Sequence, residues 1–357
     1  MSLPSDPAAA VRAVVDPAFG RSLGELNAVG EVAVDGDAAT VTLHPPCVLH
    51  PLREHIEEKV VAALGGGEVT IEWKPRVIGR NAGGRLGLTA KNIIAVGSGK
   101  GGVGKSTVAA GLAIAFAEAG AKVGLVDADI HGPSLPHLFG VSKNGPPEMT
   151  ERRGPDGKTV PRLVPVPVSL PGGQSLGLMS AAFVIPERTA AVLRGPMTQK
   201  YVLSFLQQAE WGELDYLVID LPPGTGDVAL TLAQNAALGG AVVVCTPQKV
   251  ALLDAVKAVS MYRQLEIPVL GMVENMSGDL FGRGGARTEA ESLGVPTLGE
   301  IPADGKVREL GDAGTFAGVL SEGGSAADPL RVAAGKTALE LARGALEKAR
   351  TPTLEVL

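Results

Sequence analysis

Cysteine is scarce in this sequence, and long apolar runs are missing from it. The 357 residues include two cysteines, Cys47 and Cys245, which excludes a disulfide framework and a zinc site of four thiolates from one chain. No stretch supplies the ~20 consecutive apolar residues of a membrane span. The N-terminus also lacks the basic region and apolar core of a secretory signal. We therefore expect a cytoplasmic protein that makes no membrane contact.

Positive charge is in deficit as well. Acidic side chains outnumber basic ones by 38 to 32, and the net charge is -6, so there is no general electrostatic reason to bind nucleic acid or an anionic membrane. The hydrophobic fraction of 45% is ample for a packed core. The length suits one large domain and a small one.

The first part of the chain, residues 1–88, has the pattern of a small α+β domain. Helical and strand-like stretches follow one another here without regular alternation. A glycine-rich polar segment, residues 79–90, is the best candidate for a linker. The helices are expected at residues 7–16 and 50–64, and the strands at residues 27–36, 38–46 and 68–75.

The remainder, residues 89–357, predicts a doubly wound α/β domain. Short, continuously apolar runs alternate with helical patterns, which is typical of a mostly parallel sheet covered on both faces. Such sheets bind ligands beyond the carboxyl ends of their strands. A late amphipathic helix at residues 326–350 is expected to pack on the sheet. The strands are expected at residues 92–97, 122–129, 216–224, 241–247, 268–276 and 296–302.

A phosphate-binding loop is the strongest motif. The stretch "GKGGVGKS" fits the pattern G-x-x-x-x-G-K-[ST], with a strand before it and a helix after it. Its backbone N–H groups would surround the phosphates, Lys105 would neutralise their charge, and the Ser106 hydroxyl would ligate Mg²⁺. ATP and Mg²⁺ are the predicted cofactors. The expected contact residues are Gly99, Lys100, Gly101, Gly102, Val103, Gly104, Lys105, Ser106 and Thr107.

This loop contains a second lysine, Lys100, which most loops of the kind do not need. It is either an ordinary solvated lysine, a cation that neutralises charge in its own site, or a group that reaches a nucleotide in a facing subunit. Further along, Asp127 and Asp129 end the second expected strand of the large domain, and Asp220 ends the third. Asp220 has the position of a carboxylate that holds Mg²⁺.

The loop signature G-K-G-G-x-G-K-[ST] resembles that of the deviant P-loop ATPases, which include MinD, ParA and the nitrogenase iron protein. The resemblance implies that Lys100 acts across a nucleotide-sandwich homodimer, as an arginine finger does. It also implies that Asp129 orients the attacking water and that Asn275, in "GMVENMS", contacts the adenine base. Lys100, Lys105 and Asp129 are therefore the predicted catalytic residues.

Three longer stretches resemble one branch of that group, the Mrp/ApbC family of iron-sulfur cluster carrier ATPases. They are "VDADIHGPSLPHLFG", "VLRGPMTQKYVLSFL" and "YLVIDLPPGTGDVALTLAQ". The N-terminal stretch "HPPCVLHPLREHIEEKV" resembles the small iron-sulfur assembly domain of many bacterial members, with Cys47 as its characteristic cysteine. The resemblance implies an ATPase that carries or helps transfer clusters between scaffold proteins and apo-acceptors.

The chain departs from this family at the expected cluster site. After "ENMS" many members carry a Cys-x-x-Cys pair, which supplies four thiolates in a dimer, but this chain continues "GDLFGRGGART". Cys245 lies in an apolar strand and is expected to be a core residue. Cys47 is either a ligand of a weakly held [4Fe–4S] cluster or another buried side chain. The alternatives to a carrier are a ParA/MinD-type positioning ATPase and a nucleotide-controlled scaffold with little hydrolysis.

Overall fold

The computed structural model describes residues 3–36, 38–79, 86–142, 145–153, 159–185, 195–224 and 226–348. The described chain forms two compact units. The small unit contains the residues up to Ile78 and those from Ala338 onward, and the larger unit spans Gly79–Thr337. This division falls within helix α12 (Ala327–Lys348), and the sequence-based boundary at residue 88 stays a prediction. None of the described helices combines the length and apolar character that a membrane span needs.

The small unit is a three-stranded sheet covered by two helices. Strand β4 pairs antiparallel with β3 and parallel with β5. Alternate residues of β4, including Val41 and Leu43, pack with Ile56 and Val60 of helix α2 in one core. Asp6 caps the first helix by accepting the N–H of Ala9. The elements are α1 (Pro7–Ala13), β1 (Val15–Asp16), β2 (Arg21–Ser22), β3 (Val29–Asp35), β4 (Ala38–Leu43), α2 (Arg53–Ala63) and β5 (Glu68–Trp73).

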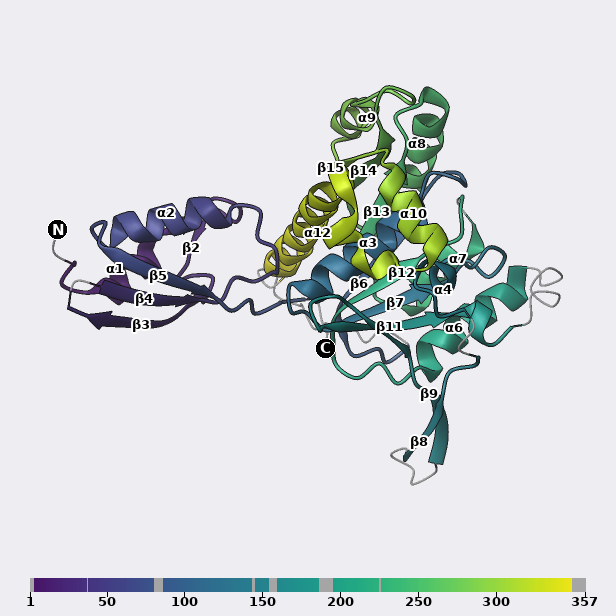
Figure 1. Ribbon diagram of the computed structural model, residues 1–357, viewed down its shortest axis with the longest axis horizontal. Helices are drawn as coiled ribbons and strands as arrows, with labels where there is room; N and C mark the ends of the chain where they lie inside the picture. Colours follow the sequence, from purple (N-terminus) through teal and green to yellow (C-terminus); the bar gives the residue numbers. More distant parts are fainter. Residues whose placement is uncertain are drawn as a thin grey trace, which may run out of the picture. The chain divides into compact units, whose positions relative to one another are not determined.

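An eight-stranded sheet forms the centre of the larger unit, in the order β10-β11-β7-β12-β6-β13-β14-β15 (Figure 1). All pairs are parallel except the pair at one edge, between β10 and β11. The predicted doubly wound, mostly parallel sheet is confirmed. The strands are β6 (Ala90–Gly97), β7 (Val123–Asp127), β10 (Val166–Ser169), β11 (Ser175–Ser180), β12 (Leu214–Asp220), β13 (Gly240–Cys245), β14 (Val269–Ser277) and β15 (Thr297–Pro302).

Helices cover both faces of this sheet, which explains why its central strands are apolar throughout. The first face packs in one core with α6 (Gly195–Gln208), α7 (Asp227–Asn235), α8 (Lys249–Gln264) and α9 (Gly285–Leu293). Helix α3 (Lys105–Glu118) contacts β6, β7 and β12 and takes no part in that core. Helix α3 packs closely on α12. This is seen at Gly111, where any side chain would overlap Leu330 of α12.

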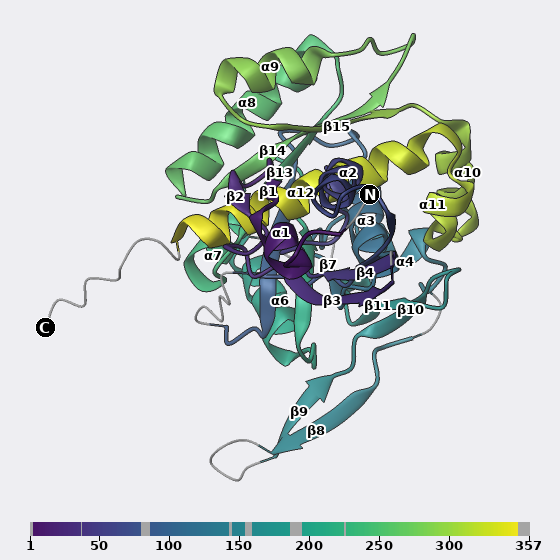
Figure 2. The ribbon, with the colours of Figure 1, turned by 90° about the vertical axis from the view of Figure 1, so that its left-hand side faces the viewer.

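A hairpin of β8 (Met149–Arg153) and β9 (Thr159–Leu163) projects from the larger unit (Figure 2). Short helices α4 (Leu135–Leu138), α10 (Gly305–Ala313) and α11 (Val319–Glu322) complete this unit. Each unit holds one of the two tryptophans of the chain. The indole N–H of Trp211 donates to the Leu206 carbonyl at 3.2 Å. That of Trp73 is buried and finds no hydrogen-bond partner among the described residues.

Candidate functional site

The glycine-rich loop connects β6 to α3 at the carboxyl edge of the sheet. Two of its glycines have left-handed backbones, Gly102 with φ 79° and Gly104 with φ 77°. Gly104 is also the N-cap of α3, and a Cβ there would overlap the amide of Asn275. At Gly99 a Cβ would overlap the Asp254 carbonyl. Glycine is therefore required for conformation and for close packing in this loop.

Helix α3 directs its free N–H groups to the space in front of the loop. Its hydrogen-bond ladder begins where Val108 donates to the Gly104 carbonyl at 3.0 Å. The N–H groups of Lys105, Ser106 and Thr107 precede that bond, so they have no acceptor within the helix. Together with the helix dipole they form a site for an anion. The fourteen-residue helix thus begins at the predicted phosphate contacts.

A buried ion pair lies directly below this anion site. The Lys105 Nζ donates to Asp220 Oδ1 at 2.5 Å and lies 3.4 Å from the Ser106 hydroxyl. Asp220 is inaccessible to solvent, and its second oxygen, Oδ2, has no hydrogen-bond partner among the described residues. Burial raises the pKa of Asp220, although Lys105 opposes the shift. A free carboxylate oxygen next to a hydroxyl is a donor set that suits Mg²⁺.

A second buried carboxylate, Asp127, lies beside Asp220 on the neighbouring strand. The two residues pair in register between β7 and β12. Burial, followed by the negative charge of Asp220, raises the pKa of Asp127 to about 8. Asp127 accepts the N–H groups of Asp129 at 3.2 Å and Leu135 at 3.1 Å. It therefore fixes the turn after β7.

The three remaining predicted site residues lie around the loop. Asp129 is half-buried, accepts the N–H of Gly132 at 3.2 Å, and is close enough to Asp220 to raise its pKa. The side chain of Lys100 is half-buried and makes no ion pair with any described residue. Asn275 is buried, and its amide donates to the Val103 carbonyl at 2.9 Å. In the structure Asn275 thus holds the loop, while its predicted contact with adenine stays a prediction.

A cavity of about 500 Å³ beside the loop was missed by the sequence analysis. One side is formed by Thr107 of α3 and by Asn275, and the other by the segment after β15. That segment is held in place by Asp304, which caps α10 and accepts both the N–H and the hydroxyl of Ser325. These hydrogen bonds, from the Ser325 hydroxyl first, lower the pKa of Asp304. The stretch "IPADGK" could have indicated this wall of the cavity, because it is a strand end followed by an N-cap residue.

Both cysteines are closed to solvent, each about 1% exposed. Burial, with a smaller contribution from Asp16, raises the pKa of Cys47 to about 12. Burial and then Glu274 raise the pKa of Cys245 to about 12. Within the part of the chain that the structure describes, no three His, Cys, Asp or Glu side chains are placed to hold a metal ion together. Cys245 is a core residue as predicted, and Cys47 is buried as well, while its role as a ligand stays a prediction.

Family models match both parts of the chain. Residues 89–336 match the family model described as NUBPL iron-transfer P-loop NTPase, and residues 8–73 match the model described as iron-sulfur cluster assembly protein. A solved nucleotide-binding protein of Archaeoglobus fulgidus, in complex with ADP, has 39% sequence identity and a TM-score of 0.52. The similarity covers 64% of this chain and 88% of that one.

Several relatives match most of the chain, and two of them serve as examples. The iron-sulfur cluster carrier protein of Synechocystis is 42% identical over 325 residues, which is 85% of this chain and 88% of the relative. The protein of the same name from Escherichia coli K12 is 42% identical over 319 residues, covering 84% of this chain and 82% of the relative. The resemblance seen in the motifs is confirmed, and the chain belongs to the iron-transfer P-loop NTPase family.

Proposed function

We propose that this protein binds and hydrolyses ATP and uses the cycle to carry iron-sulfur clusters or to assist their transfer to apoproteins. The observation that carries the ATPase half is the buried pair of Lys105 and Asp220 beneath the free N–H groups of α3. The carrier half is supported by relatives of similar length that are named iron-sulfur cluster carrier proteins.

Lys105 exchanges partners when a nucleotide binds. Without one, its ammonium group is neutralised by Asp220 at 2.5 Å. The β and γ phosphates offer stronger negative charge at the same helix end, so Lys105 turns from Asp220 to them. Asp220 and the Ser106 hydroxyl would hold Mg²⁺, and the ion would supply charge neutralisation to the phosphates.

Asp129 and Lys100 serve hydrolysis in this proposal. Asp129 sits on the turn that Asp127 fixes, where its carboxylate orients the attacking water and accepts its proton. The unpaired Lys100 stabilises negative charge on the nucleotide of a second subunit. The cavity beside Thr107 and Asn275 accepts the adenine base, because it opens next to the phosphate loop and is lined mainly by apolar side chains.

The cluster is the cargo, and this chain lacks the thiolates to hold it alone. A [4Fe–4S] cluster takes four thiolates, but even a homodimer offers four cysteines that are all buried and protonated. We therefore propose that a scaffold or apo-acceptor protein supplies most ligands. Cys47 contributes a ligand only when the small unit opens.

Anaerobic reconstitution followed by transfer to an apo-ferredoxin tests the carrier proposal. We expect transfer that speeds up with Mg·ATP and substoichiometric iron on the isolated protein, with a further loss in Cys47→Ser. Absence of ATP-dependent transfer under any thiol condition would contradict the carrier function. Full iron retention by Cys47→Ser would contradict only the role of Cys47.

Asp129→Asn tests the hydrolytic step separately. The amide keeps the shape of the side chain but is a poor proton acceptor, so ATP binding is retained while turnover falls by roughly 100-fold. Binding is measured with a fluorescent ATP analogue and turnover by phosphate release. If binding disappears and turnover per bound ATP is unchanged, Asp129 acts on the metal or the structure instead.

A further inference from the structure

A buried hydroxyl, that of Ser180, lies at the carboxyl end of strand β11. Ser180 is inaccessible to solvent and pairs in register with Asp127 of the neighbouring strand β7. Asp127 pairs in turn with Asp220 of β12. Three consecutive strands of the sheet thus end in polar side chains that are buried side by side. Ser180 is the one of the three that has no role in the proposed ATPase reaction.

The hydrogen bonds of Ser180 fix the direction of its hydroxyl proton. The oxygen accepts the N–H of Ala182 at 3.2 Å. A serine hydroxyl has a single proton to donate, and Ser180 donates it to Asp127 Oδ2, 3.4 Å away. The hydroxyl therefore points to the carboxyl group of Asp127.

Asp127 accepts two further hydrogen bonds, and both come from the segment that follows β7. Its Oδ1 accepts the N–H of Asp129 at 3.2 Å, and its Oδ2 accepts that of Leu135 at 3.1 Å. These two amides lie at the two ends of the turn that contains the Asp129 carboxylate. The orientation of the Asp127 side chain therefore sets the position of Asp129.

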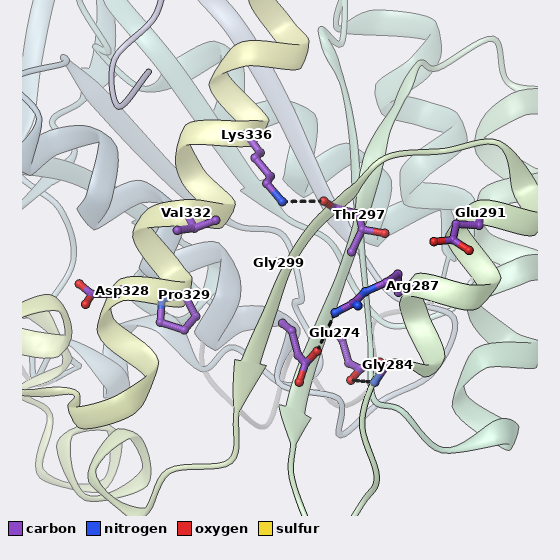
Figure 3. Close-up of a pocket in the computed structure, with 11 residues that line it drawn as sticks. Glu274, Gly284, Arg287, Glu291, Thr297, Gly299, Asp328, Pro329, Val332 and Lys336 are labelled. Atoms are coloured by element: carbon purple, nitrogen blue, oxygen red, sulfur yellow. Dashed lines mark hydrogen bonds and ion pairs between the residues drawn. The ribbon is translucent and has the colours of Figure 1, made fainter. Parts of the chain in front are cut away.

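Another buried carboxylate of the sheet holds a turn without help from a hydroxyl. Glu274 of β14 accepts the N–H groups of Gly284 and Ala286 at 2.8 and 2.7 Å, which fixes the start of α9 (Figure 3). The two backbone hydrogen bonds of Asp127 are longer than these. Because the terminal torsion of an aspartate is broad, long bonds from a single turn leave it room to rotate. A third donor on the neighbouring strand restricts that rotation.

We propose that Ser180 is a positioning residue for hydrolysis, whose hydroxyl fixes the Asp127 carboxyl group and thereby places Asp129 against the attacking water. Ser180 acts through Asp127 and is not itself catalytic. The inference rests on the proposed function of Asp129, and its tests separate the two.

Ser180→Ala tests the inference in steady-state kinetics. Without the hydroxyl the Asp127 side chain can rotate, so kcat should fall roughly three- to tenfold while Mg·ATP affinity and KM change less than about twofold. The effect is moderate because 3.4 Å is long for a hydroxyl donor. The control is Thr337→Ala, which removes another buried hydroxyl of the larger unit, bonded to the Ala333 carbonyl at 2.7 Å. It should keep the wild-type kcat.

A double-variant cycle with Asp129→Asn distinguishes positioning from a merely structural role. If Ser180 acts through Asp129, Ser180→Ala should change kcat less than about 1.5-fold in the Asp129→Asn background. A structural role would lower kcat by the same factor in both backgrounds. Amide hydrogen exchange at residues 129–135 should also become faster in Ser180→Ala and stay unchanged in Thr337→Ala.

Ser180→Cys gives an intermediate case, because it nearly keeps the volume of the side chain but donates weakly. Its kcat should lie between those of the wild type and Ser180→Ala, and it replaces the alanine variant if that protein does not fold. Melting temperature and retained Mg·ATP binding show that each variant is folded.

Three outcomes would overturn the inference. The first is wild-type kcat in folded Ser180→Ala although Asp129→Asn hydrolyses slowly, which leaves the ATPase proposal intact. The second is an equal fold-loss of kcat in both backgrounds. The third is a raised KM with unchanged kcat, which would assign Ser180 to nucleotide binding. Unchanged hydrolysis in Asp129→Asn itself would instead contradict the proposed function of Asp129, and this inference with it.

Discussion

Among the described residues each unit buries an acid–base pair, and the two pairs differ in which atom is left without a hydrogen bond. In the larger unit Lys105 contacts Asp220 at 2.5 Å, and Asp220 Oδ2 has no partner among the described residues. In the small unit His50 Nε2 lies 3.1 Å from Asp16, whose other oxygen accepts the N–H of Ala18. The first pair leaves a carboxylate oxygen unsatisfied beneath the anion site. In the second pair the unsatisfied group is the His50 Nε2, which lies within ion-pair distance of Asp16 but makes no hydrogen bond among the described residues.

This difference indicates which unit does chemistry in its present conformation. Unsatisfied buried oxygens cost stability and are retained where a ligand will satisfy them. The loop around Lys105 also contains left-handed glycines and free N–H groups. The region around Cys47, by contrast, is a packed interior with a protonated thiol. The small unit is therefore expected to act as a binding module or after a conformational change.

Lys105→Ala is expected to have the largest effect. It removes the cation that balances the phosphates and leaves Asp220 buried without a counterion, so Mg·ATP affinity and turnover should fall by about 100-fold or more. Isothermal titration measures the Mg·ATP affinity, and phosphate release measures the turnover. Lys122→Ala, an exposed lysine of the same unit, is the control. Near-normal ATP binding by Lys105→Ala would remove the functional distinction between the two pairs.

A matched pair of glycine variants sharpens the role of the loop. Gly104→Ala and Gly102→Ala both place alanine at a left-handed backbone, which costs about 1–2 kcal/mol. Only the alanine at Gly104 also overlaps the Asn275 amide, since nothing lies within 4 Å of a Cβ at Gly102. Nucleotide affinity should therefore fall more than tenfold further in Gly104→Ala. Equal losses would mean that Asn275 does not hold the loop.

Lys100→Ala should have a smaller effect on binding than on turnover. Its side chain makes no ion pair with any described residue, so ATP affinity should change less than threefold, while hydrolysis falls roughly tenfold or more. Sedimentation in the presence of ATP should show a weaker dimer. Wild-type turnover at all protein concentrations would exclude a role across subunits.

The smallest effect is expected for the thiols. Because burial raises both cysteine pKa values to about 12, only about one thiol in ten thousand is ionised at pH 8, and thiolate appears only as the pH approaches the raised pKa. Ellman's reagent should therefore label neither cysteine in the native protein and both in 6 M guanidinium. Rapid labelling that is lost in Cys47→Ser would show that the Cys47 region opens in the native protein at pH 8.

The sequence predicted those parts of the fold that depend on local pattern. Runs such as "AVVVC" are buried on both faces and lie between helices, so the parallel strands and the phosphate loop were recognisable. Strands β10 and β11 were missed, because Pro165, Pro167 and Pro171 interrupt the apolar pattern of a short antiparallel edge.

Contacts between segments that are distant in the sequence could not be predicted from the local pattern of apolar and polar residues. The hydrogen bond from Asn275 to Val103 joins residues that are 172 positions apart. The cavity beside the loop likewise combines Thr107 with the segment around Asp304. Each of these depends on which strands become neighbours, and the sheet order decides that. Burial of Cys47 likewise depends on tertiary packing, since the residue lies outside any helix or strand.

The distribution of the tryptophans gives the molecule two independent optical reporters. The Arg53 guanidinium lies over the Trp73 indole, 5.3 Å from the ring centre, and this indole makes no hydrogen bond with any described residue. The Trp211 indole, by contrast, donates to a carbonyl. These surroundings should give the two indoles different emission maxima. Replacing either by phenylalanine leaves one fluorophore of this kind, so urea titration can determine whether the units unfold together or in sequence, and whether ATP stabilises only the unit that contains Trp211.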